Sequence, residues 1–202
     1  MSNQEMINAE TKTCMVYLIR HGATPGNMEG RYIGRTDQPL SEAGKEQIRE
    51  RSYPHVDKVF ASPMIRCIET AGIIYPDAIY RLIPELRESD FGDFEGKNYE
   101  ELNGNPDYQA WIDSMGNCPF PNGESREQVR ERVCEGFRRV LNEREDAERI
   151  AVVAHGGTIM TILENLFGGN YFDYQVKNGE GYSFEISYDG ICHGLCPRSY
   201  RG

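Results

Sequence analysis

The stretch Cys-Met-Val-Tyr-Leu-Ile-Arg-His-Gly-Ala-Thr-Pro-Gly-Asn, residues 14–27, carries the main signal for the fold. Residues 14–19 are almost all apolar on both alternating faces, a pattern typical of a strand covered on both sides in a parallel sheet. This strand runs directly into Arg20, His21 and Gly22. Ligands of open α/β sheets bind beyond the carboxyl ends of the strands, so we expect a ligand at these residues.

A second apolar strand, predicted at 150–154, ends in the same way, with His155, Gly156 and Gly157. A lone histidine is more often a structural core residue than a ligand-binding one. Two of the four histidines at matching strand ends, one of them beside an arginine, favour the ligand site. Glycines allow close approach of the backbone, and the N-terminus of a helix opening at Gly156 offers free N–H groups to an anion.

The rest of the chain alternates between strand and helix patterns. Further strands are predicted at 56–60, 78–83, 182–188 and 191–195, with a hairpin turn at Asp189-Gly190 between the last two. Helices are predicted at 41–51, at 64–75 behind a Ser62-Pro63 cap, after the Ser125 and Gln128 capping box, and from Gly156. This alternation predicts an α/β fold, a three-layer sandwich with a mostly parallel central sheet flanked by helices.

One long segment, residues 88–123, breaks the alternation. It is rich in Gly, Asn, Asp and Pro, carries scattered aromatic residues, and has two short helix signals at 99–102 and 107–115. Long insertions between core elements commonly serve as lids or binding segments. We expect a small cap over the carboxyl ends of the strands, within a single domain at 14–202 that follows a disordered lead-in at 1–13.

Composition narrows the class of protein. The 202 residues carry a net charge of −10, which argues against nucleic acid and against an acidic membrane surface as partners. There is no run of 18 apolar residues, and the polar start lacks the apolar region of a signal peptide, so we expect a cytoplasmic protein. We interpret the six cysteines as reduced thiols. Cys192, His193 and Cys196 lack the second ligand pair that structural zinc requires, so no metal site is predicted.

Five short blocks in order carry a family resemblance. They are Arg20 to Asn27; Tyr32 to Asp37 with Pro39-Leu40-Ser41; Ala61-Ser62-Pro63 with Arg66 and Thr70-Ala71; Leu86-Arg87-Glu88 with Phe91 to Gly96; and His155-Gly156-Gly157. In this order and spacing, they resemble the histidine phosphatase superfamily, also called the phosphoglycerate mutase-like family. The resemblance spans residues 14 to about 167. Phe94 stands where the family usually has tryptophan.

The resemblance implies a role for each matching residue. His21 would be the nucleophile that takes the phosphoryl group, and Glu88 the general acid and then the base for water. The expected phosphate-binding residues are Arg20, Thr24, Asn27, Arg66, His155 and Gly156. Phosphoryl transfer depends mostly on positioning and charge neutralisation, so this set needs no metal or cofactor. Motif spacing selects Glu88 over Glu85, Asp90, Asp93 and Glu95, which are expected to be surface charges. Glu124 is expected to border the site, and Asp37 is a candidate for orienting the first loop.

Three activities are compatible with this pattern. The compact length favours the phosphatase branch, close to alpha-ribazole phosphatases and broad-specificity phosphatases, acting on a small phosphate monoester or, as a further option, on a phosphoprotein. A cofactor-dependent phosphoglycerate mutase is the first alternative, although mutases of this family are usually longer. A non-catalytic phosphate-binding protein is the second, because fold alone does not prove chemistry. The oligomeric state, monomer or homodimer, is left open by the sequence.

Overall fold

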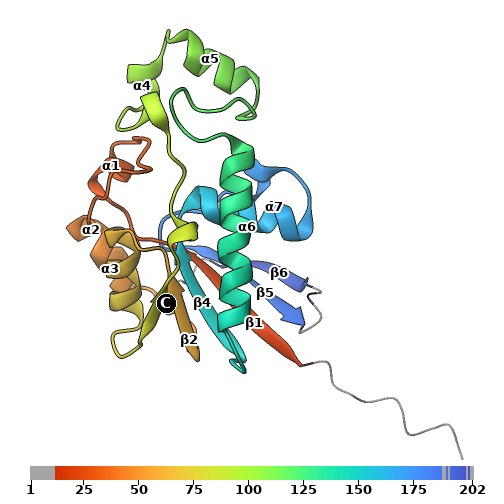
Figure 1. Ribbon diagram of the computed structural model, residues 1–202. Helices are drawn as coiled ribbons and strands as arrows, with labels where there is room; N and C mark the ends of the chain where they lie inside the picture. Colours follow the sequence, from red (N-terminus) through yellow and green to blue (C-terminus); the bar gives the residue numbers. More distant parts are fainter. Residues whose placement is uncertain (1–11, 188–189, 191, 199, 201–202) are drawn as a thin grey trace, which may run out of the picture.

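The computed structural model describes residues 12–187, 190, 192–198 and 200, and its centre is a six-stranded sheet (Figure 1). The strands are β1 (Thr13–Arg20), β2 (Lys58–Ala61), β3 (Tyr80–Leu82), β4 (Arg149–Ala154), β5 (Gly181–Ser187) and β6 (Cys192–Arg198), in the order β3-β2-β4-β1-β5-β6. The first four strands of this order are mutually parallel, whereas β5 and β6 are antiparallel to their neighbours. The predicted α/β class with a mostly parallel sheet is therefore confirmed.

Helices cover both faces of the sheet (Figure 1). They are α1 (Pro25–Met28), α2 (Glu42–Arg49), α3 (Ile65–Ile74), α4 (Tyr99–Leu102), α5 (Pro106–Asp113), α6 (Arg126–Glu143) and α7 (Gly156–Phe167), with 3-10 turns η1 (Pro84–Leu86), η2 (Gly92–Phe94) and η3 (Tyr171–Tyr174). α6 and α7 pack on one face, and α3, with α2 beside it, packs on the other. This arrangement gives the three layers expected from the sequence.

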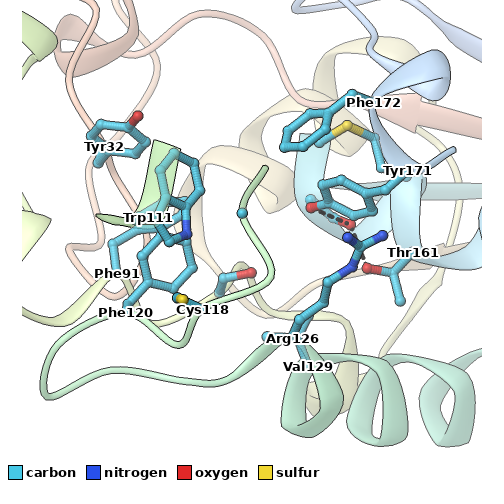
Figure 2. A pocket seen from close by; sticks show the side chains of 14 residues that line it. Tyr32, Phe91, Trp111, Cys118, Phe120, Arg126, Val129, Thr161, Tyr171 and Phe172 are labelled. Atoms are coloured by element: carbon cyan, nitrogen blue, oxygen red, sulfur yellow. Dashed lines mark hydrogen bonds between the residues drawn. The ribbon is translucent and has the colours of Figure 1, made fainter. Parts of the chain in front are cut away.

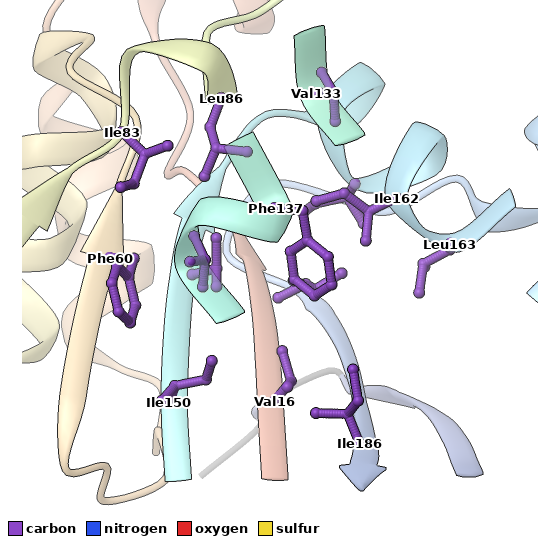
Figure 3. Close-up of a cluster of buried hydrophobic side chains, with 14 of the residues drawn as sticks. Val16, Phe60, Ile83, Leu86, Val133, Phe137, Ile150, Ile162, Leu163 and Ile186 are labelled. Carbon is purple, nitrogen blue, oxygen red and sulfur yellow. The ribbon is translucent and has the colours of Figure 1, made fainter. Parts of the chain in front are cut away.

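The core has two parts because each buried strand contributes side chains to both faces. Val16 and Leu18 of β1 join the larger cluster beneath α6 and α7, which Figure 3 shows around Phe137 and Ile162. Ile19, the next residue of β1, faces the smaller cluster beneath α3. Burial on both sides therefore keeps the end of β1, and with it Arg20 and His21, at a fixed position.

Residues 88–123 lie beyond the carboxyl ends of the parallel strands, where α4 and α5 form the top of the molecule in Figure 1. Their aromatic side chains pack on one another: Phe94 is fully buried, its ring 6.3 Å from Trp111 and 5.9 Å from Phe120. α4 has the predicted bounds, whereas α5 begins at Pro106 and ends at Asp113 because Asn105 caps it. The segment thus has its own small aromatic core.

Several predicted boundaries differ from the structure. Within the predicted lead-in, β1 begins at Thr13 and Lys12 pairs with Asp146 at 2.7 Å, while residues 1–11 lie outside the described ranges. The hairpin turn lies only partly within the described residues, with Gly190 donating its N–H to Ser187 O. α1 was not predicted, because four residues carry no periodicity. All six cysteines are unpaired, as expected, and no helix within the described part of the chain has the length and apolar character needed to cross a membrane.

The predicted cap of α3 is wrong. α3 begins at Ile65 with Met64 as its N-cap, not after Ser62, and no Met64 side-chain bond caps it. Asp37, from a distant loop, supplies the cap instead: its Oδ1 accepts the Ile65 N–H at 2.8 Å. Ser62 is fully buried; its hydroxyl bonds to His155 Nε2 at 2.8 Å and accepts the N–H of Met64, the N-cap residue, at 3.4 Å.

Candidate active site

His21 lies directly after β1, is almost fully buried and lines a cavity of about 280 Å³. Its Nδ1–H donates to Gly22 O at 2.7 Å, which leaves Nε2 unprotonated in the neutral ring. Several bonds hold the backbone: His21 N–H donates to Ala154 O at 3.0 Å, Asn178 Nδ2 donates to His21 O at 3.0 Å, and Gly22 N–H donates to Thr70 Oγ1 at 3.0 Å. The imidazole is therefore held in one tautomer and one orientation.

Burial lowers the pKa of His21 well below its ordinary value, and the charges of Arg20 and Arg66 lower it further. Only the neutral ring carries a free lone pair, so a lowered pKa keeps His21 nucleophilic across the neutral range. His155 shows the same direction for the same first cause, burial, followed by Arg66 and His21. The two rings meet edge to face, with centroids 5.2 Å apart.

Arg20 brings positive charge to the cavity beside His21. One guanidinium nitrogen donates to Val176 O at 2.7 Å, while Nε is buried and has no hydrogen-bond partner within the described structure. A Cβ at Gly156 would lie 3.5 Å from this Nε, so the first turn of α7 packs closely on the guanidinium. An unpaired buried donor next to the helix N-terminus suits an anion, and Gly156 itself lines the cavity.

Asn27 also lines the cavity, and Thr24 supports it from behind. Thr24 is fully buried and caps α1, its Oγ1 accepting the Asn27 N–H at 3.2 Å. The Asn27 side-chain oxygen accepts from the Thr24 N–H at 3.2 Å and from Asn178 Nδ2 at 3.2 Å. Since the oxygen makes both bonds, the Asn27 amide nitrogen is the group left to donate to a ligand.

Arg66 and His155 lie behind the cavity rather than along it. Both are fully buried, and neither contributes to the cavity lining. Arg66 Nε donates to His155 Nδ1 at 3.2 Å, while its other nitrogens donate to the carbonyl oxygens of Thr36 and Gly34, at 2.9 Å each. Because Nδ1 accepts, neutral His155 carries its proton on Nε2, which donates to Ser62 Oγ. Their predicted direct contact with phosphate stays a prediction.

Glu88 lines the same cavity. Its Oε2 accepts the backbone N–H of Gly157 at 3.2 Å, and its Oε1 accepts the N–H of Ser89 at 2.9 Å. Burial lowers the pKa of Arg20, and the nearby charge of Glu88 partly opposes that shift. The structure therefore brings Arg20, His21, Asn27, Glu88 and Gly156 to one cavity.

The segment that carries Glu88 is held by Arg132 of α6, a residue that the sequence analysis did not single out. The Arg132 guanidinium donates to the carbonyl oxygens of Glu85 at 2.8 Å, Arg87 at 2.9 Å and Glu88 at 3.4 Å. It also forms a bidentate pair with Glu124, at 2.9 and 2.7 Å. Local sequence offers no signal for this contact, because a solvated arginine on a charged helix has the same pattern.

Glu95 was expected to be a surface charge, and the structure corrects this. Its carboxylate accepts the backbone N–H groups of Gly34 at 3.0 Å and Thr36 at 2.9 Å. These two residues supply the carbonyl oxygens that receive Arg66. Glu95 thus fixes the loop on which Arg66 rests, and Asp37 of the same loop caps α3. Within the described residues, no group of three or more His, Cys, Asp and Glu side chains is placed to hold a metal ion.

Comparison with known proteins agrees with this geometry. The model of the histidine phosphatase superfamily (branch 1) matches residues 16–191. The chain is 32% identical to an adenosylcobalamin/alpha-ribazole phosphatase of Escherichia coli, over 76% of this chain and 79% of that protein. It is 34% identical to phosphoserine phosphatase 1 of Hydrogenobacter thermophilus, over 68% and 69%.

A solved structure, the alpha-ribazole phosphatase of Shigella flexneri, aligns with a TM-score of 0.80 at 27% identity and covers 93% of this chain and 97% of its own. The match in fold extends over the sheet, the helices and the segment above them. The chain belongs to the histidine phosphatase superfamily (branch 1).

Proposed function

We propose that the protein is a phosphomonoesterase that hydrolyses a small phosphorylated metabolite through a phosphohistidine on His21. The observation that carries the proposal is the shared cavity: a tautomer-fixed, neutral His21, the cation Arg20 and the carboxyl Glu88 all border it. Positioning and neutralisation of the phosphoryl oxygens are the main requirements of phosphoryl transfer. Relatives named as phosphatases support the same reaction class.

The proposed reaction has two steps. In the first, His21 Nε2 forms a bond to phosphorus, the bond from phosphorus to the ester oxygen breaks, and Glu88 gives its proton to the departing alkoxide. In the second, Glu88 takes a proton from water, the water oxygen bonds to phosphorus, and the bond from phosphorus to Nε2 breaks. His21 returns to its neutral form, and inorganic phosphate leaves. General acid catalysis of the first step is worth roughly 10²- to 10⁴-fold.

The residues proposed for phosphate binding form two layers. Arg20, Asn27 and the N-terminus of α7 at Gly156 face the cavity, while Thr24 orients Asn27. Arg66 and His155 form a buried layer next to His21, and their N–H groups would turn from their present partners toward the phosphoryl oxygens when phosphate binds. Two arginines with a helix N-terminus supply the charge needed, so we propose a metal-independent enzyme, acting in the cytoplasm.

The test is hydrolysis of p-nitrophenyl phosphate with EDTA present. Wild type is expected to turn over, and His21→Ala to lose all activity, whereas His193→Ala, which changes an exposed histidine on β6, is expected to match wild type. Full activity of His21→Ala would contradict the proposal. An inactive wild type would direct attention to the mutase alternative, assayed by phosphoglycerate isomerisation, and failure there would leave the phosphate-binding protein.

A further inference from the structure

A second cavity, of about 180 Å³, adjoins the proposed phosphate cavity. The two share Tyr32, Phe91, Gly157 and Met160 in their linings, so a bound molecule extending from the phosphoryl position would enter it. An apolar cavity of about 150 Å³ is large enough to bind benzene. The second cavity therefore has room for a single aromatic ring next to the reacting phosphorus.

Aromatic rings form opposite walls of this second cavity, which we call the aromatic slot (Figure 2). Trp111 and Phe120 of residues 88–123 lie on one side, with ring centroids 5.3 Å apart, and Tyr171 and Phe172 of η3 lie on the other, 5.1 Å apart. A Cβ on Gly116 would lie 3.2 Å from Phe172 Cζ and 3.3 Å from Trp111 Cζ2, so at one end a single glycine separates the walls. Walls of rings on both sides favour a flat ligand.

The cations that border the two cavities, apart from Arg20, are already paired. Arg126, in the slot, donates to Glu164 Oε1 at 2.5 Å and to Asn117 Oδ1 at 2.9 Å, and stacks over the Tyr171 ring at 4.5 Å. Arg31, in the phosphate cavity, pairs with Glu29 and Glu101 at 2.6 Å each. Among the described lining residues, a carboxylate on the leaving group finds no unmatched positive charge besides the one proposed for the phosphate.

The polar side chains around Gly157 are likewise occupied. Thr161 Oγ1 donates to Gly157 O at 2.8 Å, and the Tyr171 hydroxyl donates to the same oxygen at 3.5 Å. A charged leaving group would lose its hydration in this slot without gaining a counter-charge. An apolar ring, in contrast, gains from leaving water.

We infer that the leaving group of the substrate is an uncharged, flat and largely apolar alcohol held in this aromatic slot, and that esters with a carboxylate next to the phosphoryl group, such as phosphoserine, are poor substrates. This inference rests on the proposed phosphomonoesterase function. It selects among relatives whose names imply very different leaving groups.

The test compares kcat/KM for three alkyl esters: benzyl phosphate, ethyl phosphate and phosphoserine. Since all three are alkyl esters, their ratios report mainly on the slot rather than on leaving-group reactivity. We expect benzyl phosphate to exceed ethyl phosphate about 10- to 100-fold, the value of burying one aromatic ring, and phosphoserine to be no better than ethyl phosphate. Equal values for benzyl and ethyl phosphate, or a preference for phosphoserine, would overturn the inference and leave the proposed function intact. Hydrolysis of no ester, p-nitrophenyl phosphate included, would overturn both.

Two variants separate the shape of the slot from its charge. Trp111→Ala removes one wall and is expected to lower the ratio of benzyl to ethyl phosphate about tenfold. Glu164→Gln keeps an oxygen for Arg126 but leaves its charge unmatched, and is expected to raise kcat/KM for phosphoserine about 3- to 10-fold relative to ethyl phosphate. The matched control is Glu127→Gln, which removes the partner of Arg130 on the exposed side of α6 and is expected to change neither ratio. Unchanged ratios in both slot variants would overturn the inference.

Discussion

The backbone N–H of Gly157 donates to Glu88 Oε2 at 3.2 Å, so the first turn of α7 holds the carboxyl proposed as general acid. The same turn places Gly156 against the Arg20 guanidinium, with 3.5 Å between an added Cβ and Nε. One helix N-terminus therefore positions both the charge for the phosphate and the acid for the leaving group. Gly156 contacts the arginine, and its neighbour Gly157 bonds to the carboxyl, so substitutions at these two adjacent positions test the two groups one at a time.

Gly157→Ala is expected to displace Glu88. A Cβ there would lie 2.5 Å from Glu88 Oε1, and the flexible carboxyl would have to move. Hydrolysis of ethyl phosphate, a poor leaving group, should fall about 10- to 100-fold, with a much smaller loss for p-nitrophenyl phosphate, because only the poor leaving group needs the proton. Gly156→Ala is the matched comparison: its Cβ makes ordinary contact with Arg20, so any loss should affect both esters alike. Equal losses in Gly157→Ala would argue against Glu88 as the acid.

Glu88→Gln should also slow ethyl phosphate more than p-nitrophenyl phosphate, because it removes the proposed acid itself. The amide keeps the size of the side chain and can still accept the Gly157 N–H, but it cannot deliver a proton. We expect kcat for ethyl phosphate to fall roughly 10²- to 10⁴-fold, and kcat for p-nitrophenyl phosphate to fall far less. Steady-state kinetics with the two esters measures the difference. A uniform loss would assign the proton to another group near the cavity.

Arg132→Lys should reduce general acid catalysis by Glu88, because Arg132 holds the segment that carries Glu88. A single ammonium cannot replace a guanidinium that bonds three carbonyl oxygens and both oxygens of Glu124. We expect kcat for ethyl phosphate to fall about tenfold with little change in KM, and stability to fall by about 1.5–3 kcal/mol. Arg130→Lys, on the exposed side of the same helix, should leave both stability and kcat nearly unchanged.

A double variant distinguishes a role of Arg132 in positioning Glu88 from a general structural effect of Arg132. If Arg132 acts through Glu88, adding Arg132→Lys to Glu88→Gln should produce almost no further loss in kcat. A further tenfold loss in that background would show that Arg132 matters by another route.

The buried histidines should make stability depend on pH. Burial lowers the pKa of both His21 and His155 below the ordinary value that each regains on unfolding. The unfolded chain therefore binds protons below about pH 6.5 that the folded chain does not, and the free energy of unfolding falls as the pH falls. The loss between about pH 7 and about pH 5.5 is about 1.3 kcal/mol for each histidine that stays neutral when folded. Urea unfolding of wild type and His155→Gln checks this: the variant should lack one such increment, and identical pH dependence would contradict it.

The sequence predicts the layers of the fold where a local pattern carries the information, and the residues that it selects at two strand ends lie close together in the structure. The doubly apolar strands at 14–19 and 150–154 predict His21 and His155 at matching strand ends, and in the structure β1 and β4 are parallel neighbours. Ser125 and Gln128 form the predicted capping box of α6. These features depend on residues within a few positions of one another, so periodicity and spacing reveal them.

Contacts between distant segments are the part that sequence reasoning misses. Arg132, Asn178 and Glu95 are unremarkable polar residues until folding brings each beside a backbone group of the site. Ser62 shows the converse, since it has the pattern of a helix cap but bonds to His155 once β2 and β4 are paired. The aromatic slot likewise forms only when residues 88–123 meet η3.

The central claim is that the phosphoryl group passes through His21. Rapid acid-free quenching of the enzyme with a ³²P-labelled monoester, followed by peptide mapping under alkaline conditions, measures this most directly, because phosphohistidine survives base and is lost in acid. We predict a labelled, acid-labile peptide containing His21 in wild type and in Glu88→Gln, and no label in His21→Ala. Label on another residue, or steady turnover by wild type with no labelled protein at any time, would contradict the account.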